Sequence, residues 1–319
     1  MTIRYLKHKE IDFDKWDKCI DNAFNGIIYV YSWYLDITSH YWDALVKGDY
    51  ESLMPLPCRE KAGVNYIYQP AFVQQMGVFS LQAVSAELVQ EFINAIPKKF
   101  KYVFYNLNVN NKLPLENSYK TITNQTFELN LAEEYEVLKN NYSTNNKRNI
   151  KKAEKSNIFI TYSSGPEPII KLFQDNKGRE LATVSKTEYN NLKHLAYSCI
   201  HKRIASIHSA YSDMNTLCAG IIMLRSHKRL IFLFSGSDET ARKTGAMSML
   251  IDDLIRKNAE THYTLDFEGS NHLGTAKFYK SFGSEKLTYQ TIIINRLPWY
   301  LKLVFSIYKS VKSLLLRYV

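Results

Sequence analysis

A short run of basic and small residues has the composition of a phosphate site. Arg242 and Lys243 precede Gly245 and Ala246, and a helical pattern follows. A loop of this kind exposes backbone N–H groups at a helix N-terminus, where the helix dipole adds about half a positive charge. The segment therefore predicts that Arg242, Lys243, Gly245 and Ala246 bind the pyrophosphate of a donor. Glycine is also common where helices begin, so a plain helix start is the alternative.

A second cluster of positive charge falls on the helix predicted over Asn145–Lys155. Lys147, Lys151 and Lys155 recur every four residues and therefore share one face. Arg148 is the strongest phosphate ligand among them, because its guanidinium can bind two oxygens at once. The helix predicts either a solvated face or a site where Lys147, Arg148 and Lys151 bind an anionic substrate.

Two acids are candidates for proton transfer. Asp266 and Glu268 alternate with Phe267 at the end of the strand predicted over Tyr263–Phe267, so both carboxylates would point to one face. Glu268 lies nearer the end of the strand and is the better candidate to take a proton from an amine. The alternative is that the pair hydrogen-bonds the loop that follows.

The spacing of histidines and cysteines argues against a metal site. His194, His201 and His208 recur every seven residues along one predicted helix, about 10.5 Å of rise, which a coordination radius of ~2 Å cannot bridge. The cysteines form no C-x-x-C pair and are typical of thiols in a reducing cytosol: Cys19, Cys58, Cys199 and Cys218. We expect no metal and a cytoplasmic protein.

The composition is that of a folded, basic protein. Its 319 residues are 45% apolar and carry a net charge of +10, and this length is typical of two domains. The excess comes from two segments, residues 147–155 and the chain after Glu285. Two separate basic patches favour an anionic small substrate at one and an anionic surface at the other. The charged N-terminus has no apolar core, so we expect no signal peptide.

The elements that must position these residues fall into two mixed regions, which predict domains at 1–120 and 121–296. In the first we expect helices at Ile11–Ala23 and Ser85–Ile96, a hairpin of strands Tyr50–Arg59 and Val64–Gln69, and a strand at Lys101–Leu107. A connection is expected over residues 106–124. In the second, helices are expected at Leu131–Asn140, Asn145–Lys155, Pro168–Phe173, Thr187–His208, Gly245–Asn258 and Thr275–Phe282. The strands expected there are Thr216–Arg225, Leu230–Ser235, Tyr263–Phe267 and Leu287–Ile294, with a loop over Gly236–Thr244.

The order of these elements and their short motifs resembles the GNAT acyltransferase superfamily. The blocks that carry the resemblance are Phe234–Gly236, Arg242–Ala246, Asp266–Ser270 and Phe278–Gly283. Three more blocks resemble the FemAB-like branch: Ser32–Leu35, Gln69–Gly77 and Arg148–Lys155. This branch implies an α+β fold with two GNAT-like domains and a cleft between them. Each domain would be a mixed, mostly antiparallel sheet with flanking helices.

The resemblance also implies an activity, the transfer of an acyl group to an amine of a bacterial cell-envelope precursor, such as one of peptidoglycan, or of a polysaccharide precursor. The donor is acetyl-CoA or another acyl-CoA, or else aminoacyl-tRNA. Met247 replaces the last small residue of the usual GNAT loop, which favours tRNA, whereas no helical hairpin arm of the tRNA-binding members appears. Both donors stay open.

The resemblance implies roles for single residues. Tyr279 lies four residues before Gly283, the GNAT spacing of a tyrosine that protonates the leaving group; an ordinary core aromatic is the alternative. Arg148 and its neighbours would meet a nucleotide-sugar acceptor or the tRNA backbone. A non-catalytic GNAT-fold scaffold that binds an anionic ligand or a membrane surface is the alternative function.

The last 23 residues, 297–319, predict a basic amphipathic helix. Its apolar face would pack on protein, or its tyrosines and lysines would meet an anionic membrane at the inner face. The cytoplasmic assignment therefore includes peripheral membrane contact as an alternative.

Overall fold

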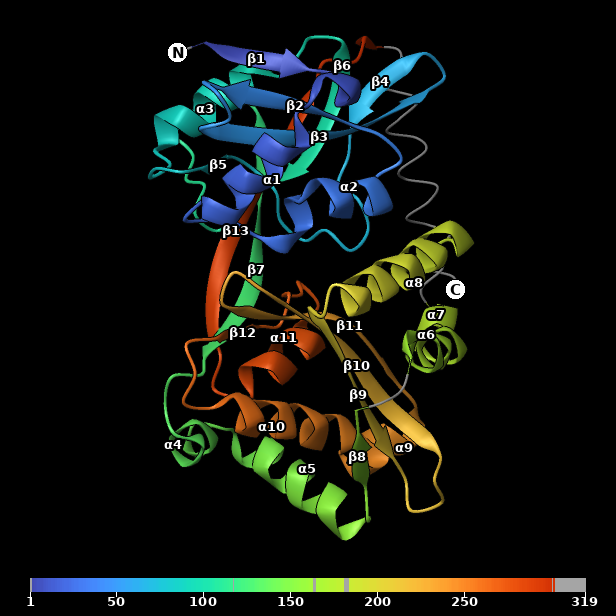
Figure 1. Ribbon diagram of the computed structural model, residues 1–319. Coiled ribbons are helices and arrows are strands. Elements are labelled where there is room, and N and C mark those ends of the chain that lie inside the picture. Colours follow the sequence, from blue (N-terminus) through green and yellow to red (C-terminus); the bar gives the residue numbers. More distant parts are fainter. Residues whose placement is uncertain (1, 117, 163–164, 181–183, 300, 302–319) are drawn as a thin grey trace. The chain divides into compact units, whose positions relative to one another are not determined.

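The chain folds into two compact units, shown in Figure 1 as a computed structural model that describes residues 2–116, 118–162, 165–180, 184–299 and 301. The first unit comprises Met1–Ile122 and the chain from Gln290, and the second comprises Thr123–Tyr289. Strands β7 (Lys120–Asn130) and β13 (Glu285–Asn295) carry the chain from the first unit to the second and back. The expected α+β class is confirmed.

The first unit is built on the strand order β1-β2-β3-β4-β6-β13, with β5 paired to β3. Its neighbouring strands run antiparallel, except that β4 and β6 are parallel. The strands are β1 (Ile3–Leu6), β2 (Trp42–Lys47), β3 (Ser52–Lys61), β4 (Val64–Ile67), β5 (Phe79–Ser80) and β6 (Phe100–Asn106). The helices are α1 (Phe13–Asn22), α2 (Ser32–Thr38) and α3 (Ala86–Ala95), with 3-10 turns at His8–Glu10 and Ile28–Val30.

Local capping explains why the helices of this unit begin where they do. The Asp12 carboxylate accepts a hydrogen bond from the Lys15 N–H at the start of α1, and the Ser85 hydroxyl accepts one from the Leu88 N–H at the start of α3. Each satisfies a backbone donor that the first helical turn leaves open. The helices, the hairpin and the last strand predicted for this region are confirmed.

The second unit is built on the order β7-β12-β11-β10-β9-β8. Neighbouring strands are antiparallel except β11 and β12, which run parallel. The strands are β8 (Phe159–Thr161), β9 (Ala205–Tyr211), β10 (Leu217–Ser226), β11 (Arg229–Ser237) and β12 (Thr264–Asp266). The helices are α4 (Tyr135–Asn140), α5 (Thr144–Lys155), α6 (Pro166–Asp175), α7 (Lys177–Glu180), α8 (Lys186–His201), α9 (Glu239–Thr244), α10 (Ala246–Asn258) and α11 (Leu273–Lys280).

Helices cover both faces of this second sheet (Figure 1). On one face α10 packs on β9 and β10, and α5 packs behind it. The other face carries α6, which lies so close to the sheet that a Cβ added at Gly220 or Gly236 would come within 2.5 Å of an Ile169 atom. Glycine at these two positions therefore allows the close approach of α6 to β10 and β11.

Three predicted elements of the second unit need correction. The helix expected over Thr187–His208 ends at His201, and His208 lies in β9 instead. Arg203 turns the chain there with φ 58°, a conformation that sequence patterns assign to glycine and rarely to arginine. The loop expected over Gly236–Thr244 contains α9, and β12 ends at Asp266 rather than Phe267.

The predicted C-terminal helix of residues 297–319 lies almost wholly outside the described residues, so its membrane or protein contacts remain a prediction. Within the described part of the chain, no helix combines the length and the apolar character that crossing a bilayer requires.

Candidate active site

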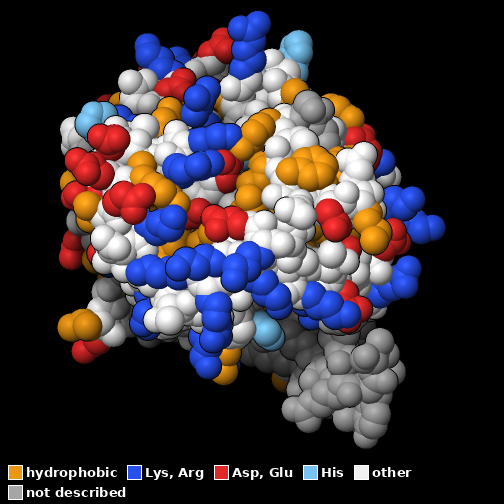
Figure 2. Space-filling model, turned by 90° about the horizontal axis from the view of Figure 1, so that it is seen from below, with side chains coloured by type: hydrophobic (Ala, Val, Ile, Leu, Met, Phe, Trp, Pro, Cys, Tyr) orange, Lys and Arg blue, Asp and Glu red, His pale blue; other side chains and the backbone are white. Residues whose placement is uncertain are grey.

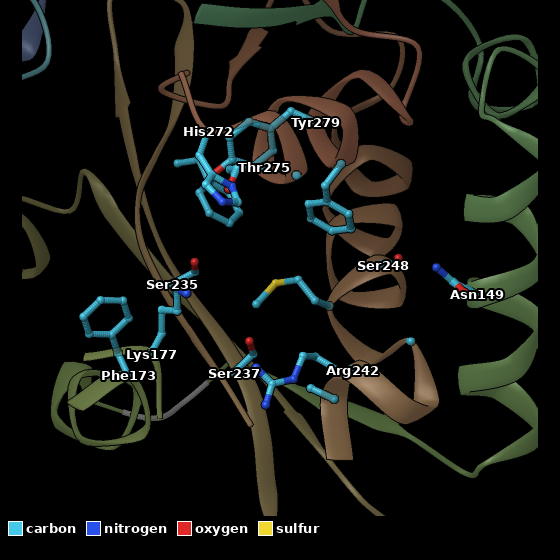
Figure 3. A pocket seen from close by; sticks show the side chains of 16 residues that line it. Asn149, Phe173, Lys177, Ser235, Ser237, Arg242, Ser248, His272, Thr275 and Tyr279 are labelled. Carbon is cyan, nitrogen blue, oxygen red and sulfur yellow. The ribbon is translucent and has the colours of Figure 1, made fainter. Parts of the chain in front are cut away.

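The site begins where two parallel strands part. The ladder between β11 and β12 pairs Arg229–Ile231 with Thr264–Asp266 and covers only these three residue pairs. β12 then ends, whereas β11 continues to Ser237. A pocket of about 440 Å³ opens beside this second half of β11 (Figure 3). An extended strand edge of this kind offers backbone N–H and C=O groups to an amide-bearing ligand.

A β-bulge determines which β11 side chains line the pocket. Met223 of β10 pairs with Phe232 and Ile222 pairs with Phe234, so Leu233 is one extra residue on β11. The extra residue reverses the alternation of side chains along the strand. As a result Phe232, Ser235 and Ser237 all line the pocket.

One end of the pocket is cationic. Arg242 of α9 lies there beside Ser237 (Figure 3). Gly245 follows in a left-handed conformation with φ 84°, and no described side chain caps the helix α10 that starts after it. Met247 and Ser248 of the first turn of α10 also line the pocket. An uncapped helix N-terminus and a guanidinium together attract an anion.

Gly245 itself has a packing role. Its N–H donates to the Ala241 carbonyl at 2.9 Å, and a Cβ at this position would lie 2.4 Å from the backbone oxygen of Asn149 on α5. Ala246 is fully buried. The glycine therefore allows α5 to approach α9 and α10, and Asn149 reaches the pocket wall.

The opposite end of the pocket is formed by α11. His272, Thr275 and Tyr279 lie together there (Figure 3). The Tyr279 ring stacks on Phe267 with centroids 4.9 Å apart and meets Phe232 edge-on at 5.9 Å. Burial, and then the negative charge of Glu268, raise the pKa of the Tyr279 phenol well above its ordinary value. The phenol therefore keeps its proton at neutral pH.

Neither of the two predicted acids lines this pocket. Asp266 is fully buried and forms an ion pair with Arg229 at 3.2 Å. Its carboxylate also accepts hydrogen bonds from the Glu268 N–H at 2.9 Å and from the Thr126 hydroxyl at 3.3 Å. Glu268 has φ 52° and lies beyond the strand. The prediction that both acids share one strand face is therefore wrong.

The predicted basic surface lies on α5. Lys147 donates to the Asn140 carbonyl at 2.9 Å, and Arg148 donates to the Asn145 side chain at 2.7 Å. Lys151 is exposed. Figure 2, which views the molecule from the side of α5, shows Lys and Arg side chains gathered in a band across the surface. None of these three side chains lines the pocket, although Asn149 on the same helix does.

The structure thus divides the predicted binding residues. It brings Arg242, Gly245 and Tyr279 to one pocket, whereas Lys243 forms an exposed ion pair with Glu239 at 2.9 Å and does not line it. Sequence reasoning missed Ser235, Ser237, His272 and Thr275 as lining residues. The small, polar residues Ser235–Ser237 directly after the apolar run Leu230–Phe234 were the available signal.

The histidine and cysteine patterns have structural explanations. His208 is buried on β9 with Nε2 2.9 Å from the Ser206 hydroxyl, while His194 and His201 lie on α8. All four cysteines are buried free thiols. Within the part of the chain that the structure describes, no three His, Cys, Asp or Glu side chains gather as metal ligands.

Comparisons with known proteins find a matching domain and similar folds. Residues 141–281 match the family profile described as acetyltransferase (GNAT) domain. The fold resembles the crystal structure of FemX, with a TM-score of 0.64 at 11% identity, over 91% of this chain and 97% of FemX. A comparison with curated protein sequences finds no match.

Two further solved structures have a similar fold. The C-terminal domain of a protein described as lysylphosphatidylglycerol synthetase, from Agrobacterium fabrum, matches with a TM-score of 0.52 at 9% identity, over 92% of this chain and 95% of that one. L-PGS from Bacillus licheniformis matches with a TM-score of 0.50 at 9% identity, over 82% and 87%. Residues 141–281 therefore match a GNAT acetyltransferase domain, and the fold of most of the chain is similar to that of FemX and of these two structures.

Proposed function

We propose that this chain is an N-acyltransferase that moves an acyl or aminoacyl group from a phosphate-bearing donor to an amine of a cell-envelope or polysaccharide precursor. One observation carries the proposal: a single pocket runs along the edge of β11, with Arg242 and the uncapped start of α10 at one end and the phenol of Tyr279 at the other. An anion-binding end and a proton-donating end are the two features that such a donor requires.

The pocket supplies three kinds of contact to the donor. Arg242 and the N-terminus of α10 attract its phosphate. The β11 edge at Ser235–Ser237 offers backbone groups to its amides. Apolar side chains enclose its uncharged part: Phe232, Met247 and Phe278.

Two donors share this phosphate chemistry, acyl-CoA and aminoacyl-tRNA. Met247 lies in the first turn of α10 and occupies space that a small residue would leave to a pyrophosphate. We therefore propose the chemical class, a phosphate-bearing acyl carrier, and let the binding experiment separate its two sources. Both donors are made inside the cell, so we propose that the enzyme acts in the cytoplasm.

The phenol of Tyr279 is the proposed acid. When the acceptor amine attacks the donor carbonyl, a C–N bond forms and the bond from the acyl carbon to the leaving sulfur or oxygen breaks. A departing thiolate or alkoxide needs a proton. Tyr279 retains one because burial and Glu268 raise the pKa of its phenol, and the stack on Phe267 fixes its ring.

The basic surface of α5 is the proposed site for an anionic acceptor or for the tRNA backbone. Asn149 lines the pocket and Lys151 is exposed on the same helix, so a ligand held by α5 would lie next to the donor. A nucleotide-sugar that carries an amine fits this charge. Arg148→Ala and Lys151→Ala are expected to weaken binding of UDP-sugars.

Calorimetry on matched variants tests the donor site. Acetyl-CoA, CoA and uncharged tRNA are titrated into the wild type, Arg242→Ala and Lys243→Ala. We expect Arg242→Ala to weaken binding of one of these ligands about tenfold, equal to ~1.4 kcal/mol. Lys243→Ala is the control, since it removes the same charge one residue away and outside the pocket.

The ligand that binds identifies the donor. Equal affinities of the two variants would contradict the phosphate role of Arg242. If none of the ligands binds and no transfer to an amine is measured, a non-catalytic scaffold is favoured instead. A ligand at a hundred times its dissociation constant stabilises the folded state by about 2.7 kcal/mol, so thermal unfolding gives an independent check.

A further inference from the structure

Acyl transfer to an amine also needs a group that takes the amine proton. Asp266 is buried in an ion pair, and neither Asp266 nor Glu268 lines the pocket. The titratable side chains that do line it are those of Lys177, Arg242, His272 and Tyr279. An arginine stays protonated, and Tyr279 keeps its proton. Histidine is the side chain type best suited to accept a proton near neutral pH.

We propose that His272 is the general base of the transfer reaction, an inference that rests on the proposed function. His272 is the residue directly before α11, and its backbone N–H donates to the Ser270 hydroxyl at 3.0 Å. Its side chain lies at the same end of the pocket as Tyr279 (Figure 3). A base and an acid at one end of the pocket could act on the same bound acyl group.

Thr275 positions the imidazole ring. Its hydroxyl oxygen, in the first turn of α11, lies 3.5 Å from Nδ1 of His272. When Nδ1 carries the ring proton toward this hydroxyl, Nε2 is the free acceptor. A Cβ at Gly274 would lie 3.1 Å from the ring carbon Cε1, so glycine there leaves room for the ring.

The proton balance of the step is complete. The amine nitrogen attacks the acyl carbon, and its N–H proton passes to Nε2 of His272. The bond from the acyl carbon to sulfur or oxygen breaks, and the phenol of Tyr279 protonates the leaving group. The imidazolium then loses its proton to solvent or to the Tyr279 phenolate, which restores both groups. No oxidant, metal or further reactant takes part in this balance.

Charged groups near His272 come from the pocket lining and from α11, and the negative charge of Glu268 acts on Tyr279 at the same end of the pocket. Lys177 and Arg242 line the same pocket, and Lys277 and Lys280 lie on α11. Tyr279 is uncharged at neutral pH.

Transfer kinetics over a range of pH test the proposal. Radiolabelled acetyl-CoA and aminoacyl-tRNA are each offered with a series of UDP-amino sugars. We expect His272→Gln to lower kcat by about 10²–10⁴-fold, to remove the acidic limb of the pH–rate profile, and to leave donor affinity unchanged. Added imidazole is expected to restore part of the rate in His272→Ala.

Two matched variants accompany this test. His262→Gln changes an exposed histidine that does not line the pocket and should keep the wild-type rate. Thr275→Val should lower kcat less than His272→Gln while keeping the acidic limb, because it removes the positioning contact and not the base.

Each outcome is decisive. A wild type that transfers, with a His272→Gln variant that keeps its rate and its acidic limb, overturns the base role. Loss of the limb in Glu268→Gln instead would assign the role to that acid and also overturn the inference. A wild type that transfers from neither donor to any of these amines refutes the proposed function, and the base role with it.

Discussion

The two halves of strand β11 differ in strand pairing, in ion pairing and in access to the pocket. Along Arg229–Ile231 the strand is paired on both sides, by β10 and β12. Arg229 there forms ion pairs with Glu128 at 2.6 Å and with the fully buried Asp266 at 3.2 Å. From Phe232 to Ser237 the strand runs beside the pocket, with hydroxyl side chains toward it. One strand thus holds a closed ionic cluster and an open site a few residues apart.

This contrast shows that charge alone is a poor guide to catalysis. Asp266 has the residue type of a base, yet its buried carboxylate already accepts hydrogen bonds from a guanidinium, a hydroxyl and a backbone N–H. Ser235, Ser237 and His272 have ordinary surface residue types, yet they line the pocket. The end of the β12 ladder separates the two groups.

The strongest test of the closed half removes its cation. Arg229→Met leaves two carboxylates, of which Asp266 is fully buried, without their shared partner. Breaking a buried ion pair from one side costs about 3–5 kcal/mol. We therefore expect urea denaturation to show a loss of unfolding free energy of that size.

Arg225→Met is the control for this change. Arg225 lies on the same hairpin and is exposed, so its substitution should alter the unfolding free energy by less than ~0.5 kcal/mol. Equal effects of the two substitutions would show that the cluster does not fix the first half of β11.

The open half is tested at Tyr279. Tyr279→Phe keeps the ring that stacks on Phe267 and removes only the hydroxyl. Loss of a general acid lowers kcat by about a hundredfold or more, ~2.7 kcal/mol of transition-state stabilisation. Single-turnover kinetics should show this loss, whereas the urea midpoint should stay close to that of the wild type.

A second tyrosine provides the matched control for Tyr279→Phe. The pKa of Tyr289 is raised to about 12 by burial and by the charges of Glu268 and Asp266, but Tyr289 does not line the pocket. Tyr289→Phe should therefore keep the wild-type rate. A rate loss in Tyr289→Phe and none in Tyr279→Phe would show that Tyr289, and not Tyr279, is the acid.

Local patterns predicted most elements of the fold. Ser85, the first residue of the predicted helix Ser85–Ile96, accepts a hydrogen bond from the Leu88 N–H at the start of α3, as a sequence N-cap signal predicts. The hairpin of β10 and β11 followed from two apolar runs around a short turn. These features depend on residues close together in the chain.

The parts that sequence reasoning missed depend on distant residues or on unusual backbone. Arg203 and Glu268 both adopt positive φ without being glycine, so the end of α8 and the end of β12 were misplaced. The pocket also needs the Leu233 bulge and the early end of β12, and neither leaves a local pattern. The family resemblance supplied Tyr279, while His272 had to wait for the assembled site.

The smallest expected effect is a pH dependence of the unfolding free energy, caused by the buried Asp266 beside the first half of β11. Burial raises the pKa of Asp266 from 3.8 to about 6, although Arg229 opposes the shift. The folded state therefore holds this proton more tightly than the unfolded chain does. The contribution of Asp266 to stability is present at low pH and is lost as the pH rises from about 4 to about 6.

Asp266→Asn removes this dependence because an amide does not titrate, and its oxygen can still accept from the Thr126 hydroxyl and the Glu268 N–H. Relative to the variant, the wild type should lose about 1–3 kcal/mol of unfolding free energy across that interval, measured by urea denaturation at several pH values. Asp213→Asn, at an exposed turn, should give no such trend. The opposite result, a wild type that gains stability relative to Asp266→Asn as the pH rises, would mean that the Arg229 charge outweighs burial. The ion pair would then stabilise the first half of β11.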